Sequence, residues 1–272
     1  MLKNSTTKLV GILNVTNDSF SDGGKYIDLD LAVKRIEELL NEGVDVIDIG
    51  AESTRPGAIA ISYQEEWSRL EPVLQLFKSQ FNNTKVLLSV DTYHTETAAL
   101  AINYGIDWVN DVSGCEAQAM QQLIAGNGVK VVVSHNLGVP VKKGITLPEN
   151  VDIVSVVIKW AKERIVQLIA NDIKKEQIIF DPGIGFGKTS KQSLTLLKNI
   201  AEFLQLGVEV LVGHSRKSFF SAMTDVEAFE RDIETCVVSA YLSLQNVHYL
   251  RVHNVHANKR AVTVATNLFD YT

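Results

Sequence analysis

Short apolar runs end on polar residues at eight places along the chain, and these polar residues are the ones that could do chemistry. The first run covers residues 9–13, ends on Asn14 and then breaks into a stretch rich in Asn, Asp, Ser and Gly. A run of this length between polar residues is typical of a buried strand that delivers polar groups onto a loop. Its repetition predicts one open site built from many strand ends. The residues at these ends are Asn14, Asp48, Asp91, Asn110, His135, Asp181, Lys217, Arg251 and His253.

Three of these residues, Asp91, Asn110 and Asp181, offer carboxylate and amide groups. Carboxylates suit a flat heterocycle that carries ring N–H and amino donors, and Lys217 can donate to a ring carbonyl or nitrogen. The set therefore indicates recognition of a pterin-like or purine-like edge. Asp48 is the member that we expect to have a structural role.

Arg251 and His253 lie two residues apart in an expected strand, so their side chains point to the same side. Together with Asn14 and Arg55 they predict a site for phosphate or pyrophosphate. Mg²⁺ held by the Asn14 oxygen and the phosphates is compatible with this set, because Mg²⁺ commonly takes few protein ligands. Zinc is not expected, since the two histidines of 253–256 lack the helical HExxH form.

Helices are expected between the strands, because apolar residues recur there at helical spacing. The strands are expected at residues 9–13, 44–50, 86–90, 107–111, 129–135, 177–180, 208–212 and 249–253. The apolar stripes of two expected helices are Val154, Ile158, Ala161, Ile165 and Ile169, and Leu194, Leu197, Ala201 and Leu204. This alternation predicts one α/β domain over residues 1–272, a closed (β/α)8 TIM barrel with its active site at the C-terminal face of the strands. A doubly wound open sheet is the alternative.

The composition is that of an ordinary globular protein, with 272 residues, 46% hydrophobic and 21% charged. The net charge is −6 and no block of five like charges occurs, so we expect no nucleic-acid partner. Cys115 and Cys236 lack metal-ligand spacing and are expected to be reduced thiols in a cytoplasmic protein. No apolar run approaches about 18 residues, so neither a membrane span nor a signal peptide is expected.

A glycine-rich stretch at 183–189 resembles a phosphate loop but is not a Walker A loop, because Pro182 occupies the position of its first glycine. Its glycines are expected to let a tight loop carry Phe186 over the site. The histidines His94, His214 and His248 are expected to be packed or solvated rather than functional. No Ser/His/Asp triad or nucleophile elbow occurs at a recognisable spacing.

Taken together, these motifs resemble the dihydropteroate synthase family, the folate-pathway enzymes targeted by sulfonamides. The matching stretches follow the family's order and span nearly the whole chain. They are Gly11-Ile-Leu-Asn-Val-Thr-Asn-Asp-Ser-Phe-Ser-Asp-Gly-Gly24, Asp48-Ile-Gly-Ala-Glu-Ser-Thr-Arg-Pro-Gly57, Ser89-Val-Asp-Thr92, Asn110-Asp111, Asp181-Pro-Gly-Ile-Gly-Phe-Gly-Lys188, Ser215-Arg-Lys-Ser218 and Arg251-Val-His253.

The resemblance implies a homodimeric transferase that uses Mg²⁺. Such an enzyme condenses 6-hydroxymethyl-7,8-dihydropterin pyrophosphate with p-aminobenzoate to give 7,8-dihydropteroate and pyrophosphate. The residues it implies are Asp91, Asn110, Asp181 and Lys217 for the pterin, and Asn14, Arg55, Arg251 and His253 for the pyrophosphate, with Asn14 on the metal. For p-aminobenzoate they are Phe20, Thr54, Pro56, Phe186, Lys217 and Ser218. The catalytic set would be Asn14, Asp91, Lys217, Arg251 and His253.

The chain departs from the family pattern at several positions, which are Asn17, Ala51, Ser134, Asn136, His214 and Glu234. None of them removes an expected pterin or pyrophosphate contact. A folate-dependent methyltransferase domain is one alternative, but it should lack the stretches at 53–57 and 215–218. A non-catalytic pterin-binding paralogue is the other, suggested by the unusual end of the fifth strand.

Overall fold

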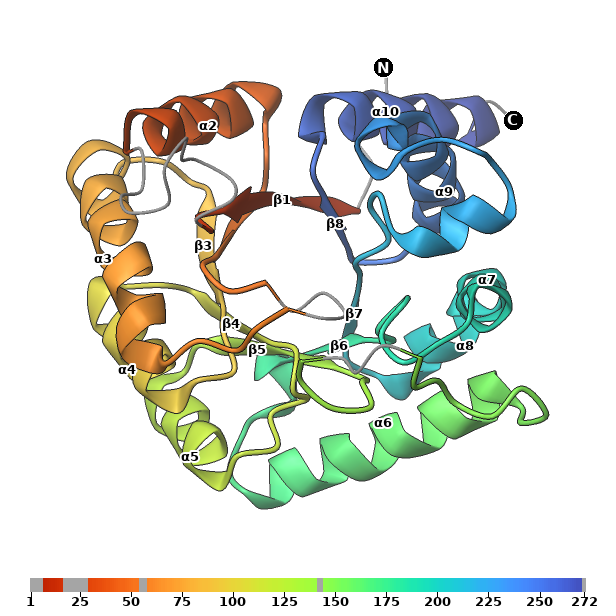
Figure 1. Cartoon of the computed structure of the whole chain (residues 1–272), viewed down its shortest axis with the longest axis horizontal. Helices are drawn as coiled ribbons and strands as arrows, with labels where there is room; N and C mark the ends of the chain where they lie inside the picture. The colour runs from red at the N-terminus through yellow and green to blue at the C-terminus, as the bar shows by residue number, and fades with distance from the viewer. Residues whose placement is uncertain (1–6, 17–28, 54–57, 141–143, 271–272) are drawn as a thin grey trace.

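Eight parallel strands form a closed barrel in the computed structural model, which describes residues 7–16, 29–53, 58–140 and 144–270 (Figure 1). Each strand pairs with the next, and β8 returns to pair with β1. The strands are β1 (Lys8–Asn14), β2 (Val46–Gly50), β3 (Leu87–Asp91), β4 (Trp108–Asp111), β5 (Lys130–Ser134), β6 (Ile178–Asp181), β7 (Glu209–Val212) and β8 (Tyr249–Val252). The predicted (β/α)8 barrel is therefore confirmed, and the closure excludes an open sheet.

The helices form a ring around the barrel, as Figure 1 shows. They are α2 (Leu29–Glu42), α3 (Tyr63–Gln80), α4 (Thr95–Tyr104), α5 (Gln118–Asn127), α6 (Ile153–Ala170), α7 (Ser190–Lys198), α8 (Ile200–Phe203), α9 (Asp232–Leu244) and α10 (Val255–Asp270). The last helix, α10, packs on both α9 and α2 and so completes the ring. Across the described residues, no helix is both long and apolar enough to cross a bilayer.

An apolar layer fills the barrel and supports the site above it. Its members are Val10, Val46, Trp108, Val132, Ile179, Leu211 and Tyr249. Because strand side chains alternate between faces, the residue two positions further along each strand points into the barrel again. Those positions include Asp48, Asn110, Asp181 and Arg251. The alternation thus stacks polar strand ends directly on an apolar floor.

The start of α7 fixes where the glycine-rich loop ends. Thr189 accepts a hydrogen bond from the Gln192 backbone N–H at 3.2 Å, and the Gln192 side chain accepts one from the Thr189 N–H at 3.0 Å. This reciprocal capping box satisfies two backbone donors that would otherwise lack partners. The loop at 182–188 is therefore bounded by β6 on one side and by a capped helix on the other.

The helix predicted through residues 194–204 is interrupted, which corrects the sequence prediction. Asn199 leaves the helical conformation, and its side chain donates to the Thr195 carbonyl at 2.8 Å. The chain continues as α8 and a 3₁₀ turn, and the buried apolar side chains of the segment are Leu196, Leu197, Ile200 and Phe203. The apolar stripe expected on α6 agrees with the structure more closely, because only Ile169 of its five members is exposed.

Candidate active site

A guanidinium from β8 lies between two carboxylates at the C-terminal end of the barrel. Arg251 Nε donates to Asp48 Oδ2 at 2.5 Å, and Arg251 Nη2 donates to Asp91 Oδ2 at 2.7 Å. Asp48 is fully buried, and it also accepts from Ser89 at 2.5 Å and from the Asn110 amide at 2.9 Å. Asp48 therefore holds Arg251 and Asn110 in place, which fits the structural role expected for it.

A second charged pair faces the same space from β6 and the loop after β7. Asp181 accepts from the Gly183 N–H at 2.8 Å, and Lys217 Nζ donates to the Ile184 carbonyl at 2.5 Å. A Cβ added to Gly213 would lie 3.7 Å from Asp181 Oδ2 and 3.9 Å from Lys217 Nζ. The glycine thus keeps open the space between the carboxylate and the ammonium.

Gly50 likewise keeps a space open, on the opposite side of the barrel mouth. A Cβ at this position would lie 3.7 Å from Asn14 Oδ1 and 3.7 Å from Asp91 Oδ2. The Asn14 amide oxygen and the Asp91 carboxylate therefore border one open position above β2. Oxygen atoms of this kind are the ligands that Mg²⁺ takes. Among the described residues, no group of three His, Cys, Asp or Glu residues could hold a metal. Mg²⁺ commonly takes few protein ligands and keeps several waters, so this pair of oxygens is compatible with it.

Burial perturbs the titratable groups of the site. It raises the pKa of Asp91 to about 7 although the Arg251 guanidinium opposes the shift, and it raises the pKa of Asp181 against the effect of Lys217. Burial also lowers the pKa of Lys217 to about 8, with Asp181 opposing. A ligand that hydrogen-bonds to these groups would offset the cost of keeping them charged. Groups perturbed in this way are typical of functional sites.

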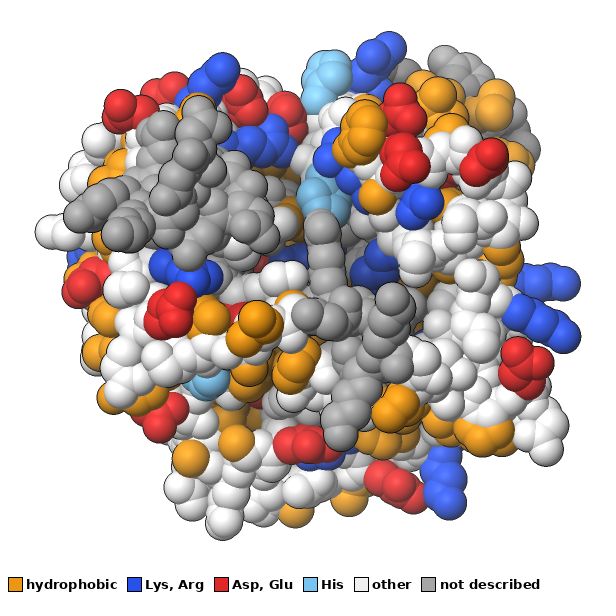
Figure 2. All heavy atoms as spheres, in the orientation of Figure 1, with side chains coloured by type: hydrophobic (Ala, Val, Ile, Leu, Met, Phe, Trp, Pro, Cys, Tyr) orange, Lys and Arg blue, Asp and Glu red, His pale blue; other side chains and the backbone are white. Residues whose placement is uncertain are grey.

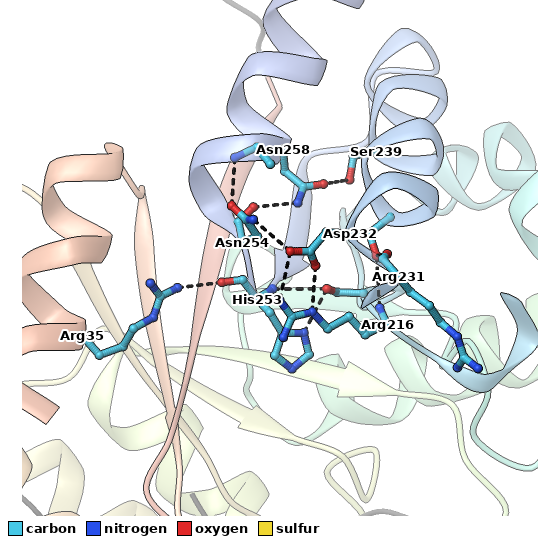
Figure 3. A network of polar contacts seen from close by, with 11 residues as sticks. Arg35, Arg216, Arg231, Asp232, Ser239, His253, Asn254 and Asn258 are labelled. Atoms are coloured by element: carbon cyan, nitrogen blue, oxygen red, sulfur yellow. Dashed lines mark hydrogen bonds and ion pairs between the residues drawn. The ribbon is translucent and has the colours of Figure 1, made fainter. Parts of the chain in front are cut away.

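His253 is held at the mouth from two sides (Figure 3). Ser215 Oγ lies 2.9 Å from His253 Nδ1 and accepts from the His253 backbone N–H at 3.2 Å. Arg35, from α2, donates to the His253 carbonyl at 2.6 Å. Three segments far apart in the sequence therefore meet at this histidine.

A pocket of about 310 Å³ opens beside His253. Its walls are Ile12, Arg35, Glu42, Arg216, His253 and Asn254. Arg216 is oriented by two hydrogen bonds to Asp232, at 2.7 and 3.0 Å. Figure 2 shows Lys, Arg and His side chains gathered in the hollow between α2 and α10. The mouth is therefore suited to an anion next to His253.

The fifth strand end differs from the prediction. Ser134, not His135, occupies the position in register with Asp181. The His135 ring instead packs edge-on against Trp160 of α6, with ring centroids 5.0 Å apart, and its Nδ1 is 2.9 Å from Lys188 Nζ. The expected convergence of His135 with the other strand ends is therefore not met. The mouth is formed by the remaining eight.

The structure describes only some of the residues that are expected to bind p-aminobenzoate. Phe20, Thr54 and Pro56 lie outside the described residues, and so does Arg55, which was expected at the pyrophosphate. Phe186 is half-buried with Lys217 Nζ 4.2 Å from its ring centroid, and Ser218 is exposed at the start of a 3₁₀ turn.

The histidines without an expected role are partnered in the fold. His214 is buried, and its Nε2 lies 2.9 Å from Ser239 Oγ. His248 Nδ1 accepts from the Val210 N–H at 3.0 Å, and His94 lies 3.3 Å from a Glu52 oxygen. Each contacts a residue at least 25 positions away in the sequence, which is compatible with the packed role expected for them.

Sequence reasoning missed four residues that hold the site together. Ser89 could have been found, because it lies two positions before Asp91 and so shares its face of the strand. Ser215 and Lys188 belong to recognised motifs but were given no role. Arg35 has no sequence signal, since it lies in an ordinary amphipathic helix.

Comparison with known proteins identifies the family. The model described as "Pterin binding enzyme" matches residues 10–253. The chain belongs to the pterin-binding enzyme family. Within that family, the folate synthesis bifunctional protein of Chlamydia caviae is 38% identical over 263 residues, covering 95% of this chain and 59% of that protein. This chain thus spans less than two thirds of that relative. The dihydropteroate synthase of Clostridium beijerinckii is 38% identical over 94% of this chain and 91% of its own length.

Solved structures of pterin-binding enzymes have the same architecture. The dihydropteroate synthase from Anaplasma phagocytophilum with bound 6-hydroxymethylpterin-monophosphate has a TM-score of 0.88 and 39% identity, over 97% of this chain and 99% of that one. The Xanthomonas albilineans dihydropteroate synthase with 4-aminobenzoic acid has a TM-score of 0.89 and 34% identity, over 98% and 94%. The Yersinia pestis dihydropteroate synthase in a sulfonamide drug complex has a TM-score of 0.86 and 32% identity, over 95% and 93%.

Proposed function

We propose that this chain is a dihydropteroate synthase, a transferase of folate biosynthesis. It condenses 6-hydroxymethyl-7,8-dihydropterin pyrophosphate with p-aminobenzoate and forms 7,8-dihydropteroate and pyrophosphate. The observation that carries this proposal is the convergence of Asp91, Asp181 and Lys217 on one barrel mouth, with Arg251 and His253 beside them. The bound pterin phosphate and 4-aminobenzoic acid of the related structures support it.

The pterin ring would be bound by acceptors and donors that the strands hold rigidly. Asp91 and Asp181 accept from its ring N–H and amino groups, and Lys217 donates to a ring carbonyl or nitrogen. The Asn110 side chain is oriented for such a contact by its hydrogen bond to Asp48. Because hydrogen bonds already hold Asp91 and Asn110 in place, little side-chain conformational entropy is lost on binding.

The pyrophosphate would lie between Arg251, His253 and Asn14, and Arg55, which lies outside the described residues, is the further cation proposed to bind it. Positive charge and hydrogen-bond donors aimed at the leaving oxygens stabilise the negative charge that develops as the C–O bond breaks. The carboxylates of Asp91 and Asp181 stabilise the positive charge left on the pterin methylene. No covalent intermediate with the protein is required.

The Asn14 oxygen fits Mg²⁺ in this arrangement, because it borders the same open position as Asp91. When bound together with the diphosphate, Mg²⁺ would neutralise part of the phosphate charge.

The arylamine would be bound nearer the mouth by Phe186, Lys217 and Ser218, together with Phe20, Thr54 and Pro56. Its nitrogen is already a competent nucleophile, so holding it next to the methylene carbon supplies most of the remaining acceleration. A sulfonamide resembles p-aminobenzoate in shape and charge, and we propose that it competes for this position. The sulfonamide complex of the Yersinia pestis relative supports that part of the proposal.

Pyrophosphate release tests the function directly. The protein is incubated with the dihydropterin pyrophosphate, with and without p-aminobenzoate and Mg²⁺, and both pyrophosphate and dihydropteroate are measured. Release that requires both additions, with equimolar dihydropteroate, is the expected result. Pterin binding without product would favour the non-catalytic paralogue instead. A folate-dependent methyltransferase is disfavoured, since the dedicated relatives and structures named above are synthases.

The affinity for free 6-hydroxymethylpterin should pass through a maximum between about pH 7 and about pH 8. Asp91 must be ionised to accept from the ring, and its pKa of about 7 means that binding displaces a proton at lower pH. Affinity therefore rises as the pH approaches that value. Lys217 must be protonated to donate, and its pKa of about 8 makes affinity fall at higher pH.

Calorimetry in two buffers of different ionisation enthalpy measures the displaced proton. Asp111→Asn is the matched control, because burial raises the pKa of Asp111 to about 6 but this residue is not in the proposed pterin set. Loss of the rising limb in that variant would assign the titration to Asp111 and contradict the prediction.

We also propose that the enzyme is a homodimer joined through α9 and α10. Ile233 and Val237 lie four residues apart on one face of α9 and are 77% and 65% exposed. On α10, which packs against α9, Leu268 is 68% exposed. An exposed apolar face of this kind is typical of a contact surface.

A Val237→Asp variant should be monomeric, because a charge in the centre of an apolar interface cannot be solvated there. Light scattering after gel filtration should give twice the chain mass for the unmodified protein and the chain mass for the variant. Val166→Asp on α6 is the control, since Val166 is 67% exposed as well. A monomeric unmodified protein, or equal behaviour of both variants, would rule out this interface.

A cytoplasmic location and a single functional unit over residues 1–272 complete the proposal. The free thiols of Cys115 and Cys236 support the location.

A further inference from the structure

The loop between β6 and α7 is organised around a buried ammonium group. Lys188 is 6% exposed, and its Nζ lies 2.9 Å from the Gly183 carbonyl and 2.9 Å from the Phe186 carbonyl. The side chain therefore bonds to two backbone carbonyls of its own loop. An ammonium has three donors, so a third hydrogen bond is left to be made.

The third partner is the end of β5. Lys188 Nζ lies 2.9 Å from His135 Nδ1 and 3.2 Å from the His135 carbonyl. Burial and the Lys188 charge lower the pKa of His135 to about 3, which keeps the imidazole neutral and able to accept. The ammonium therefore ties the loop to the neighbouring strand.

The backbone of the loop is shaped for this contact. Gly183 has a positive φ of 67°, and a Cβ there would lie 1.9 Å from the His135 carbonyl oxygen. Gly187 has a φ of 61°, and its Cβ would meet the Leu137 side chain at 2.6 Å. Only glycine at both positions lets the loop lie this close to the chain after β5.

The other face of the loop borders the proposed active site. Lys217 Nζ donates to the Ile184 carbonyl at 2.5 Å and lies 4.2 Å from the centroid of the Phe186 ring. Lys188 thus binds the loop backbone on the side of β5, while Lys217 lies against the Phe186 ring on the side of the proposed active site. Without Lys188, the Phe186 carbonyl would lose this hydrogen bond, and the Phe186 ring would no longer be held in place.

We propose that Lys188 is a positioning residue for the arylamine substrate, which sets the place of the Phe186 ring by binding the Gly183 and Phe186 carbonyls to β5. The proposal rests on the synthase function proposed above. It assigns Lys188 a larger effect on p-aminobenzoate than on the pterin. Of the two proposed pterin carboxylates, Asp91 lies on β3, away from this loop, and only Asp181 adjoins it, through the Gly183 N–H.

Lys188→Met tests the assignment, because methionine keeps the length of the side chain and removes all three donors. We expect the KM for p-aminobenzoate to rise about tenfold, as for a displaced aromatic contact. The dissociation constant of free 6-hydroxymethylpterin should rise by less than about threefold, since Asp91 and Asn110 lie on other strands and only Asp181 and Lys217 contact this loop. Assays at pH 6.5 keep the ammonium charged in the reference enzyme, because burial lowers the pKa of Lys188 to about 7. Lys191→Met in the first turn of α7 is the control, since Lys191 is exposed.

A double substitution shows whether Lys188 acts through Phe186. In a Phe186→Ala background, Lys188→Met should raise the KM for p-aminobenzoate by less than about twofold. An undiminished tenfold effect there would overturn the proposed route. Lys188→Gln, which keeps two N–H donors, replaces the methionine variant if that variant fails to fold, and we expect an intermediate KM.

The remaining outcomes separate this proposal from the function on which it rests. An unmodified enzyme that binds pterin but forms no dihydropteroate overturns the synthase function, and the role of Lys188 with it. Normal turnover together with an unchanged p-aminobenzoate KM in Lys188→Met overturns only the role of Lys188. Equal losses for p-aminobenzoate and pterin would mean a purely structural lysine, which also overturns it.

Discussion

We expect the Asp91→Asn variant to bind free 6-hydroxymethylpterin at least about 100-fold more weakly than the unmodified enzyme. The carboxylate is the proposed acceptor for the ring N–H and amino donors, and hydrogen bonds to a charged group are each worth about 1.5–3 kcal/mol. Asparagine is almost the same size, but it replaces one acceptor oxygen with a donor that faces the donors of the pterin. Binding is measured by calorimetry near pH 7.5.

This substitution also breaks the hydrogen bond between Asp91 and Arg251, so its effect on the fold needs a control. Asp232→Asn breaks the Arg216 ion pair, whose partners are 29% and 27% exposed against 19% and 20% for Arg251 and Asp91. Asp232 lies outside the proposed pterin set. The control should therefore keep its affinity for free pterin within a few-fold. Retention of tight pterin binding by Asp91→Asn would remove this residue from the site.

The barrel and most of its mouth were predictable because they depend on local patterns. An apolar run indicates a buried strand, and the polar residue that ends it marks the end of the strand that faces the active site. Asp91, Asp181 and Arg251 were found in this way. Once eight such strands close into a barrel, their ends meet whatever the intervening helices contain.

His135 shows where this reasoning stops. The strand before it, β5, is buried on both faces, so its sequence has no alternation that distinguishes inward from outward positions. A shift of one residue exchanges the two faces. The register of β5 with β6 places Ser134 in the mouth and turns His135 toward α6. Only the pairing with the neighbouring strand carries this information.

Contacts between distant segments were likewise invisible in the sequence. Arg35 reaches the carbonyl of His253 across 218 positions of the chain, from a helix with an ordinary apolar face. Arg251 was predicted to bind a phosphate and Asp91 a heterocycle, yet the two side chains bind each other. The sequence suggests which ligand each group suits, but it cannot tell that the two ligand sites share an ion pair.

That shared ion pair makes Arg251→Met the most informative substitution at the mouth. Removing the guanidinium should weaken binding of the dihydropterin pyrophosphate at least about 100-fold, because charge-assisted hydrogen bonds to the phosphates are lost. Free 6-hydroxymethylpterin has no phosphate, and its affinity should fall by less than about tenfold through the altered surroundings of Asp91. The ratio of the two losses, measured by calorimetry on one preparation, is the decisive quantity.

The same substitution should destabilise the fold, because fully buried Asp48 loses its only cationic partner among the described residues. Leaving a buried charge unpaired costs about 3–5 kcal/mol, which urea unfolding can measure. Lys130→Met is the control for the two affinities, since it removes an ion pair with Glu209 at the N-terminal end of the barrel, whose partners are 32% and 34% exposed. The control should keep both affinities. Equal losses for the two ligands in Arg251→Met would mean that the arginine supports the fold and the pterin site without binding the diphosphate.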